Sequence, residues 1–173
     1  MDTALGGTVE STAPEIQVSN WFNTPAPLTL AALRGEVVML HAFQMLCPGC
    51  VMQETPQAVR IWNQFRERGL KVIGLHTVFE HHAVMTPEAL AVYLHEFRIP
   101  FPVGVDRAST DRSVPQTMAA YEMRGTPTTI LIDRAGKIRH HHFGSNCDGS
   151  LADEIEILLS ERRPGIRASS PAV

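Results

Sequence analysis

The residues from Val37 to Phe43 form an unbroken, almost entirely apolar run that begins with two β-branched valines. A run of this length without polar alternation predicts a strand buried on both faces. A strand of that kind belongs in a sheet with helices on both sides. Three residues later comes Cys47-Pro48-Gly49-Cys50, which places two cysteines at a strand-to-helix junction. Such a pair either stores two electrons as a disulfide or binds a metal ion.

The spacing within this motif predicts different roles for the two cysteines. If Cys47 is the N-cap of a helix, Pro48 occupies the first helical position, where its missing N–H costs nothing. The Cys47 sulfur then faces unpaired backbone N–H groups and the positive end of the helix dipole, which favour the thiolate. Cys50 lies three residues further on the same helical face. We therefore expect Cys47 to be the nucleophile and Cys50 the buried residue that resolves a mixed disulfide.

The rest of the chain alternates between strand-like and helix-like segments, which predicts an α/β sheet, largely parallel, with an antiparallel hairpin at its end. The order favours one domain over residues 15–163, with a mobile segment at 1–14 and a disordered tail at 164–173. Thr86 and Pro87 are expected to begin one of the helices. The segments expected after the first strand are a helix at 50–66, a strand at 71–78, a helix at 86–98, a strand at 101–105, a helix at 115–123, a hairpin at 128–143 and a helix at 150–162.

Charge and hydropathy exclude several classes of partner. The net charge is −3 and no long run of Lys or Arg occurs, which argues against nucleic-acid binding. No apolar stretch reaches the roughly 18 residues of a membrane span. Residues 1–7 lack the basic and apolar regions of a signal peptide. We expect a cytoplasmic protein if Met1 is the natural start, and a periplasmic one if a signal peptide was removed.

A second motif, Gly125-Thr126-Pro127-Thr128, precedes the predicted hairpin. Together with the two cysteines it resembles the thioredoxin superfamily, and most closely the TlpA/redoxin-type oxidoreductases, which adjoin the AhpC/TSA peroxiredoxins. The resemblance covers residues 16–163 and implies a thioredoxin-like fold, a central mixed sheet with helices on both faces. It also implies a thiol–disulfide oxidoreductase that exchanges a Cys47–Cys50 disulfide with protein or small-molecule thiols. No cofactor beyond this disulfide is expected, and the upstream reductant stays open.

The resemblance also implies roles for the second motif. Pro127 would be cis and lie against the cysteines, and Thr126 would offer its backbone to an extended substrate segment. Pro48 and Gly49 would line the same substrate site. From the residues alone, an ordinary trans proline at the start of an edge strand is the alternative.

Several positions depart from the family's pattern. Leu46 stands where a tryptophan usually precedes the first cysteine. His41 occupies the buried position, six residues before Cys47, that commonly holds a carboxylate or a small polar residue. The usual helix glutamate position holds Gln53, and Glu54 follows it. Either the helix contains one extra residue, as in a π-bulge, or the acid role is lost. His41 and Glu54 are thus rival candidates for taking the Cys50 proton.

Two other functions remain open at this level. A thiol peroxidase would use Cys47 with Cys50 as its resolving partner. The peroxidase pattern of Pro and Thr before the cysteine is absent, because Leu40 and Gln44 stand there. A copper-binding module would use both cysteines and a histidine such as His76. A structural zinc site of the usual four-ligand kind lacks two further ligands, so none is predicted.

The remaining histidines and the third cysteine are not expected to carry chemistry. His76 precedes a group of polar residues at the end of a predicted strand, and we interpret the whole group as solvated loop residues rather than a metal site. His140, His141 and His142 lie in a predicted strand, whose neighbours point to opposite faces, so they should not converge on one ion. Cys147 is expected to be a free surface thiol. The polar residues grouped with His76 at the end of that strand are Glu80, His81 and His82.

Overall fold

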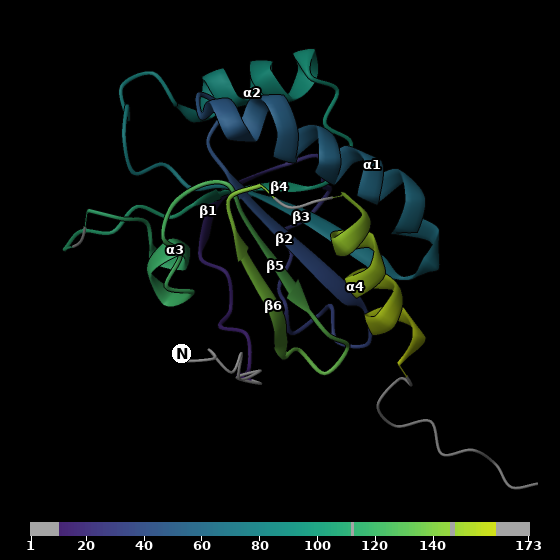
Figure 1. Ribbon diagram of the computed structural model, residues 1–173. Helices are drawn as coiled ribbons and strands as arrows, with labels where there is room; N and C mark the ends of the chain where they lie inside the picture. Colours follow the sequence, from purple (N-terminus) through teal and green to yellow (C-terminus); the bar gives the residue numbers. More distant parts are fainter. Residues whose placement is uncertain (1–10, 112, 146–147, 162–173) are drawn as a thin grey trace, which may run out of the picture.

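The computed structural model describes residues 11–111, 113–145 and 148–161, which form a six-stranded sheet with helices on both faces (Figure 1). The strand order is β1-β4-β3-β2-β5-β6. The strands are β1 (Val18–Phe22), β2 (Val37–Phe43), β3 (Leu70–His76), β4 (Val103–Asp106), β5 (Thr128–Ile132) and β6 (Ile138–Phe143). The helices are α1 (Thr55–Phe65), α2 (Pro87–Glu96), α3 (Gln116–Ala120) and α4 (Asp148–Ser160), with a π-helix, η1 (Cys50–Glu54), and a 3₁₀ turn, η2 (Arg66–Arg68), flanking α1.

The sheet is mixed, and its parallel part is smaller than the sequence suggested. Only β2–β3 and β3–β4 pair in parallel, whereas β1–β4, β2–β5 and β5–β6 are antiparallel. Strand β1 was not predicted from the sequence; it is an edge strand whose residues are exposed or half-buried. A strand with so little buried surface carries no continuous apolar signal, so only its pairing with β4 reveals it.

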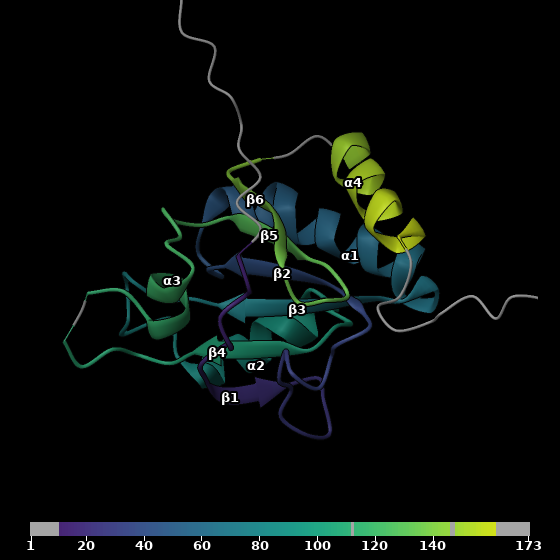
Figure 2. The same ribbon diagram turned by 90° about the horizontal axis from the view of Figure 1, so that it is seen from below.

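Strand β2 is central and all seven of its residues are buried, as the apolar run predicted. Its alternate side chains enter two separate cores. Met39 and Phe43 pack beneath α1, α2 and α4, and Leu40 and Ala42 pack on the α3 side. Figures 1 and 2 show the three helices on one face of the sheet and α3 on the other. Because helices cover both faces of the sheet at this strand, its sequence shows no alternation of polar and apolar residues.

Residues 11–14, which were expected to belong to a mobile segment, are hydrogen-bonded to the domain. The Ala13 N–H donates to the Gly136 carbonyl at 2.9 Å, and the Ile138 N–H donates to the Ser11 carbonyl at 2.9 Å. These bonds attach the segment to the β5–β6 turn. The remainder of the predicted mobile segment and the predicted tail at 164–173 lie outside the described residues.

Helix α2 begins as the sequence predicted. Thr86 has an extended backbone and its hydroxyl accepts the Ala89 N–H at 3.3 Å, with Pro87 at the first helical position. Within the described ranges, no helix combines the length and the apolar character needed to cross a bilayer.

Candidate active site

Cys47 lies at the start of a helix, as its spacing predicted. Helical backbone begins at Pro48, and the Val51 N–H donates to the Cys47 carbonyl at 3.0 Å. The Cys47 sulfur accepts the Cys50 N–H at 3.4 Å, so the side chain itself caps the helix. The same sulfur lies 3.6 Å from the Thr126 carbonyl oxygen, to which the thiol donates. The half-buried sulfur is therefore held between a helix N-terminus and the loop before β5.

Cys50 differs from Cys47 in solvent exposure, because Cys50 is completely buried. Burial raises the pKa of the Cys50 thiol to about 12, and the contact with Cys47 acts in the same direction. Desolvation penalises a buried thiolate, so Cys50 is protonated at neutral pH. The two cysteines thus form an asymmetric pair in which Cys47 faces solvent and Cys50 lies behind it.

The Thr126–Pro127 peptide bond is cis, and the loop that contains it touches the cysteine motif. A methyl group at Gly49 would lie 3.6 Å from the Pro127 Cδ atom, which is ordinary van der Waals contact. The Gly144 N–H donates to the Pro127 carbonyl at 2.9 Å, so the end of β6 anchors this loop. Pro48 is exposed beside it. The residues proposed for the substrate site from sequence therefore lie together.

Gln44 joins the loops around the cysteines, a role that the sequence analysis missed. Its side chain donates to Glu80 at 3.3 Å and to the Thr126 hydroxyl at 3.5 Å, and it accepts the Phe79 N–H at 3.2 Å. The Cys47 N–H in turn donates to the Gln44 carbonyl at 3.1 Å. Gln44 is only 1% exposed. Its polar side chain directly after an apolar strand was the available signal, since a buried amide needs several partners.

The helix after Cys50 contains the extra residue that was one of the two alternatives for Glu54. Residues Cys50–Glu54 form a π-helix, in which the Thr55 N–H donates to the Cys50 carbonyl five residues earlier. Glu54 and Thr55 are both buried at 2% exposure, whereas Gln53 is exposed. The π turn therefore points two neighbouring polar residues into the protein on the Cys50 side.

His41 is buried on the Cys50 side of the sheet, as predicted, but its environment makes it a weak base. Its Nε2 atom and the Thr55 hydroxyl are hydrogen-bonded at 3.1 Å, and its ring stacks on Phe43 with centroids 5.4 Å apart. Its Nδ1 atom has no hydrogen-bond partner within the described part of the chain. Burial lowers the pKa of His41 to about 4, so the imidazole is neutral at pH 7. Tyr93 is also buried, and burial raises the pKa of its hydroxyl.

The loop histidines do not assemble as a group. His76 closes β3, is 1% exposed, and accepts the Met45 N–H on Nε2 at 3.2 Å, so its placement in a solvated loop was wrong. Burial lowers the pKa of His76 to about 4. Its Nε2 atom is committed to the loop before Cys47, which weakens the copper alternative. Only Glu80, His81 and His82 are exposed, as expected.

The other histidine expectation needs a correction. Adjacent strand residues do point apart, but His140 and His142 are two residues apart and share one face of β6. They converge with Glu154 of α4, as described below. Strand β6, which contains these histidines, lies at one edge of the sheet. Cys147, predicted to be a surface thiol, lies outside the described residues.

Comparisons with known proteins agree with this geometry. The model of the AhpC/TSA family matches residues 9–141. A crystal structure of a thioredoxin-like superfamily protein is 55% identical, covers 88% of this chain and 99% of that one, and has a TM-score of 0.86. The structure of a thiol-disulfide isomerase from Corynebacterium glutamicum is 48% identical, with coverage of 87% and 98% and a TM-score of 0.82. Protein DipZ of Mycobacterium tuberculosis is 29% identical over 93% of this chain, which spans only 22% of DipZ.

Proposed function

This chain belongs to the AhpC/TSA family, and from that premise we propose that it is a thiol–disulfide oxidoreductase acting through Cys47 and Cys50. The asymmetric cysteine pair carries the proposal. The Cys47 sulfur caps a helix and is partly exposed, whereas Cys50 is fully buried one turn further on. The isomerase with 48% identity supports the same class of chemistry.

The exchange follows from the placement of the two sulfurs. The Cys47 thiolate attacks one sulfur of a substrate disulfide, and the other substrate sulfur leaves as a thiolate that takes up a proton. The Cys50 sulfur, after losing its own proton, then attacks the Cys47 sulfur and displaces the second substrate thiolate. The substrate gains two electrons and the Cys47–Cys50 disulfide forms. The reverse sequence oxidises a substrate dithiol.

The surface around Cys47 suits an extended polypeptide substrate. Leu46, directly before the nucleophile, is 54% exposed and offers apolar contact where relatives carry a tryptophan. Pro48, directly after Cys47, is exposed, and Thr126 presents its carbonyl group beside the sulfur. A peptide lying along this loop would bring its disulfide to the Cys47 sulfur.

The resolving step needs a base, and we propose Glu54 rather than His41 for it. Burial lowers the pKa of His41 to about 4 and raises the pKa of the Cys50 thiol to about 12, so this imidazole is a poor acceptor for the Cys50 proton. Glu54 is a buried carboxyl group that lies one turn from Cys50 in the π-helix. His41, bonded to the neighbouring Thr55, would then position this part of the helix rather than accept the proton.

Trapping experiments test the assigned roles. In a Cys147→Ser background, Cys50→Ser should accumulate mixed disulfides with a disulfide-containing peptide, visible by mass spectrometry, because the resolving sulfur is gone. Cys47→Ser should trap little, since Cys50 is buried and protonated. The Cys147→Ser protein alone serves as the matched control and should turn the peptide over normally. Equal trapping by both variants would contradict the proposal.

Two further measurements separate the rival functions and bases. Consumption of hydrogen peroxide faster than reduction of the peptide disulfide would favour a thiol peroxidase instead. Glu54→Gln should slow release of the mixed disulfide at Cys47 and leave its formation unchanged. If His41→Gln slows release more than Glu54→Gln does, the assignment of the base is wrong.

A further inference from the structure

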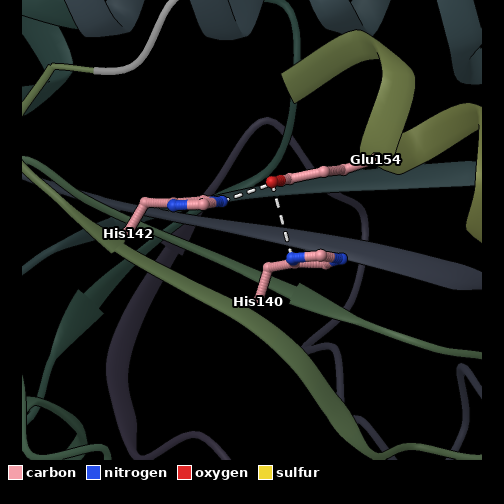
Figure 3. Close-up of side chains that lie close together, drawn as sticks. All are labelled: His140, His142 and Glu154. Carbon is pink, nitrogen blue, oxygen red and sulfur yellow. Dashed lines mark hydrogen bonds and ion pairs between the residues drawn. The ribbon is translucent and has the colours of Figure 1, made fainter. Parts of the chain in front are cut away.

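Two histidines and a glutamate form a cluster outside the cysteine site (Figure 3). His142 Nε2 lies 2.7 Å from one Glu154 oxygen, and His140 Nδ1 lies 3.5 Å from the other. One ligand atom from each residue fits within 4.8 Å of the others. The two imidazole rings are stacked, with centroids 5.8 Å apart and planes 14° from parallel. All three residues therefore direct donor atoms to one small volume between β6 and α4.

The local structure accounts for this convergence. Residues two apart on a strand share a face, so His140 and His142 point the same way while His141 points to the opposite face. Glu154 projects from α4, which covers that face of β6. The three side chains are between 19% and 32% exposed, so the cluster is half-buried and open to ions from solvent.

We propose that His140, His142 and Glu154 bind a divalent transition-metal cation of the Zn²⁺ type. Two imidazole nitrogens and one carboxylate oxygen are a donor set used for zinc, with a fourth position left for water. At metal–ligand distances of about 2.0–2.1 Å, tetrahedral donors lie about 3.3 Å apart. The two histidine nitrogens lie 2.7 and 3.5 Å from the two Glu154 oxygens, and one donor atom from each residue lies within 4.8 Å of the others, so rotations of the side chains would have to bring the three donors to that spacing. Mg²⁺ and Ca²⁺ prefer oxygen ligands and do not suit this set.

A bound cation would link an edge strand to the helix that covers it. Gly144 directly follows β6, and its N–H donates to the carbonyl of Pro127. The metal would thus sit on the strand that holds the loop beside the cysteines, without using either cysteine as a ligand. Without metal the same residues form only a close histidine–carboxylate contact, and a metal titration distinguishes the two cases.

Titration with Zn²⁺ tests the site. The protein should be untagged and carry Cys47→Ser, Cys50→Ser and Cys147→Ser, so that no thiol competes for the ion. We expect one equivalent of Zn²⁺ by calorimetry, and affinity weakened by about tenfold or more in His142→Gln and in Glu154→Gln. His141→Gln is the matched control, because it changes a histidine on the same strand that faces away, and it should bind normally. Circular dichroism without zinc verifies that each variant is folded.

Cobalt spectra of the protein with its cysteines intact give a second measurement. Co²⁺ at this site should show weak visible bands without the intense near-ultraviolet absorption of thiolate ligation, and His140→Gln should abolish the visible bands. Failure of the triple serine variant to bind zinc, or unchanged binding in His142→Gln, would overturn the site. Equal loss in His141→Gln would do the same. None of these results depends on whether Cys47 and Cys50 exchange disulfides.

Discussion

Acidification from pH 7.5 to 5.5 should destabilise this protein by about 3 kcal/mol, because His41 and His76 are buried as neutral imidazoles. Burial lowers the pKa of each from 6.5 to about 4. Neither side chain is more than 1% exposed, so solvent cannot relieve the cost of charging it in place.

The sign and size follow from proton linkage. Between pH 6.5 and 4 an unfolded chain binds a proton on each of these two histidines, whereas the folded chain does not. The unfolded state is therefore stabilised relative to the folded state as the pH falls. The stability that these two histidines contribute is therefore constant well above pH 6.5 and declines as the pH falls from about 7 toward 4. Between pH 7.5 and 5.5 each histidine contributes somewhat more than about 1 kcal/mol, and the pair about 3 kcal/mol. Asp106 opposes this trend, because burial raises the pKa of its carboxyl group and favours the folded state in acid.

Urea unfolding at pH 7.5, 6.5 and 5.5, followed by circular dichroism, measures the effect. His76→Gln should remove about half of the loss between pH 7.5 and 5.5, whatever its own stability at pH 7.5. His81→Gln is the matched control, since His81 is exposed. Stability that stays within about 0.5 kcal/mol over this range would refute the reasoning, as would a pH dependence that His76→Gln leaves intact.

Three further substitutions test packing, capping and the buried network. Gly74→Ala should destabilise by about 1–3 kcal/mol in urea unfolding, because its methyl group would lie 2.9 Å from Val103 inside the sheet, whereas Gly149→Ala, with nothing within 4 Å, should not destabilise. Thr86→Ala should cost about 1 kcal/mol by the same measurement, since it removes the cap of α2, and no loss would contradict the cap. Thr55→Val removes the hydroxyl bonded to His41 and should slow release of the mixed disulfide in rapid-quench experiments, without slowing its formation; unchanged release would show that the hydroxyl has no part in the resolving step.

Local patterns predicted the elements that position the cysteines. The apolar run became β2 residue for residue, and the order of cysteine, proline, glycine and cysteine gave a capped helix start. Thr86 and Pro87 marked the start of α2. In each case the signal and the structure lie within a few neighbouring residues, where propensity and periodicity act directly.

The sequence could not show features that depend on contacts between distant segments. Whether His76 is solvated or buried depends on the loop before Cys47, 31 residues away, which supplies its hydrogen bond. The side-chain amide of Gln44 is important because it joins two distant segments, one at Phe79 and Glu80 and the other at Thr126. Convergence of His140 with Glu154 requires α4 to pack on β6. These arrangements arise from tertiary packing, and no window of sequence contains them.

The π turn after Cys50 has a consequence for comparing this chain with its relatives. The extra residue in this turn moves every later residue of the helix one place further along the sequence. The position that faces the interior stays where it is in space, so the next residue in the sequence occupies it. An alignment without a gap therefore sets Gln53 against the acid of other proteins and counts the acid as lost, although Glu54 occupies the interior. Deleting the exposed Met52 should convert the π turn to an ordinary α-helical turn, so that residues of this helix align without a gap with those of related proteins.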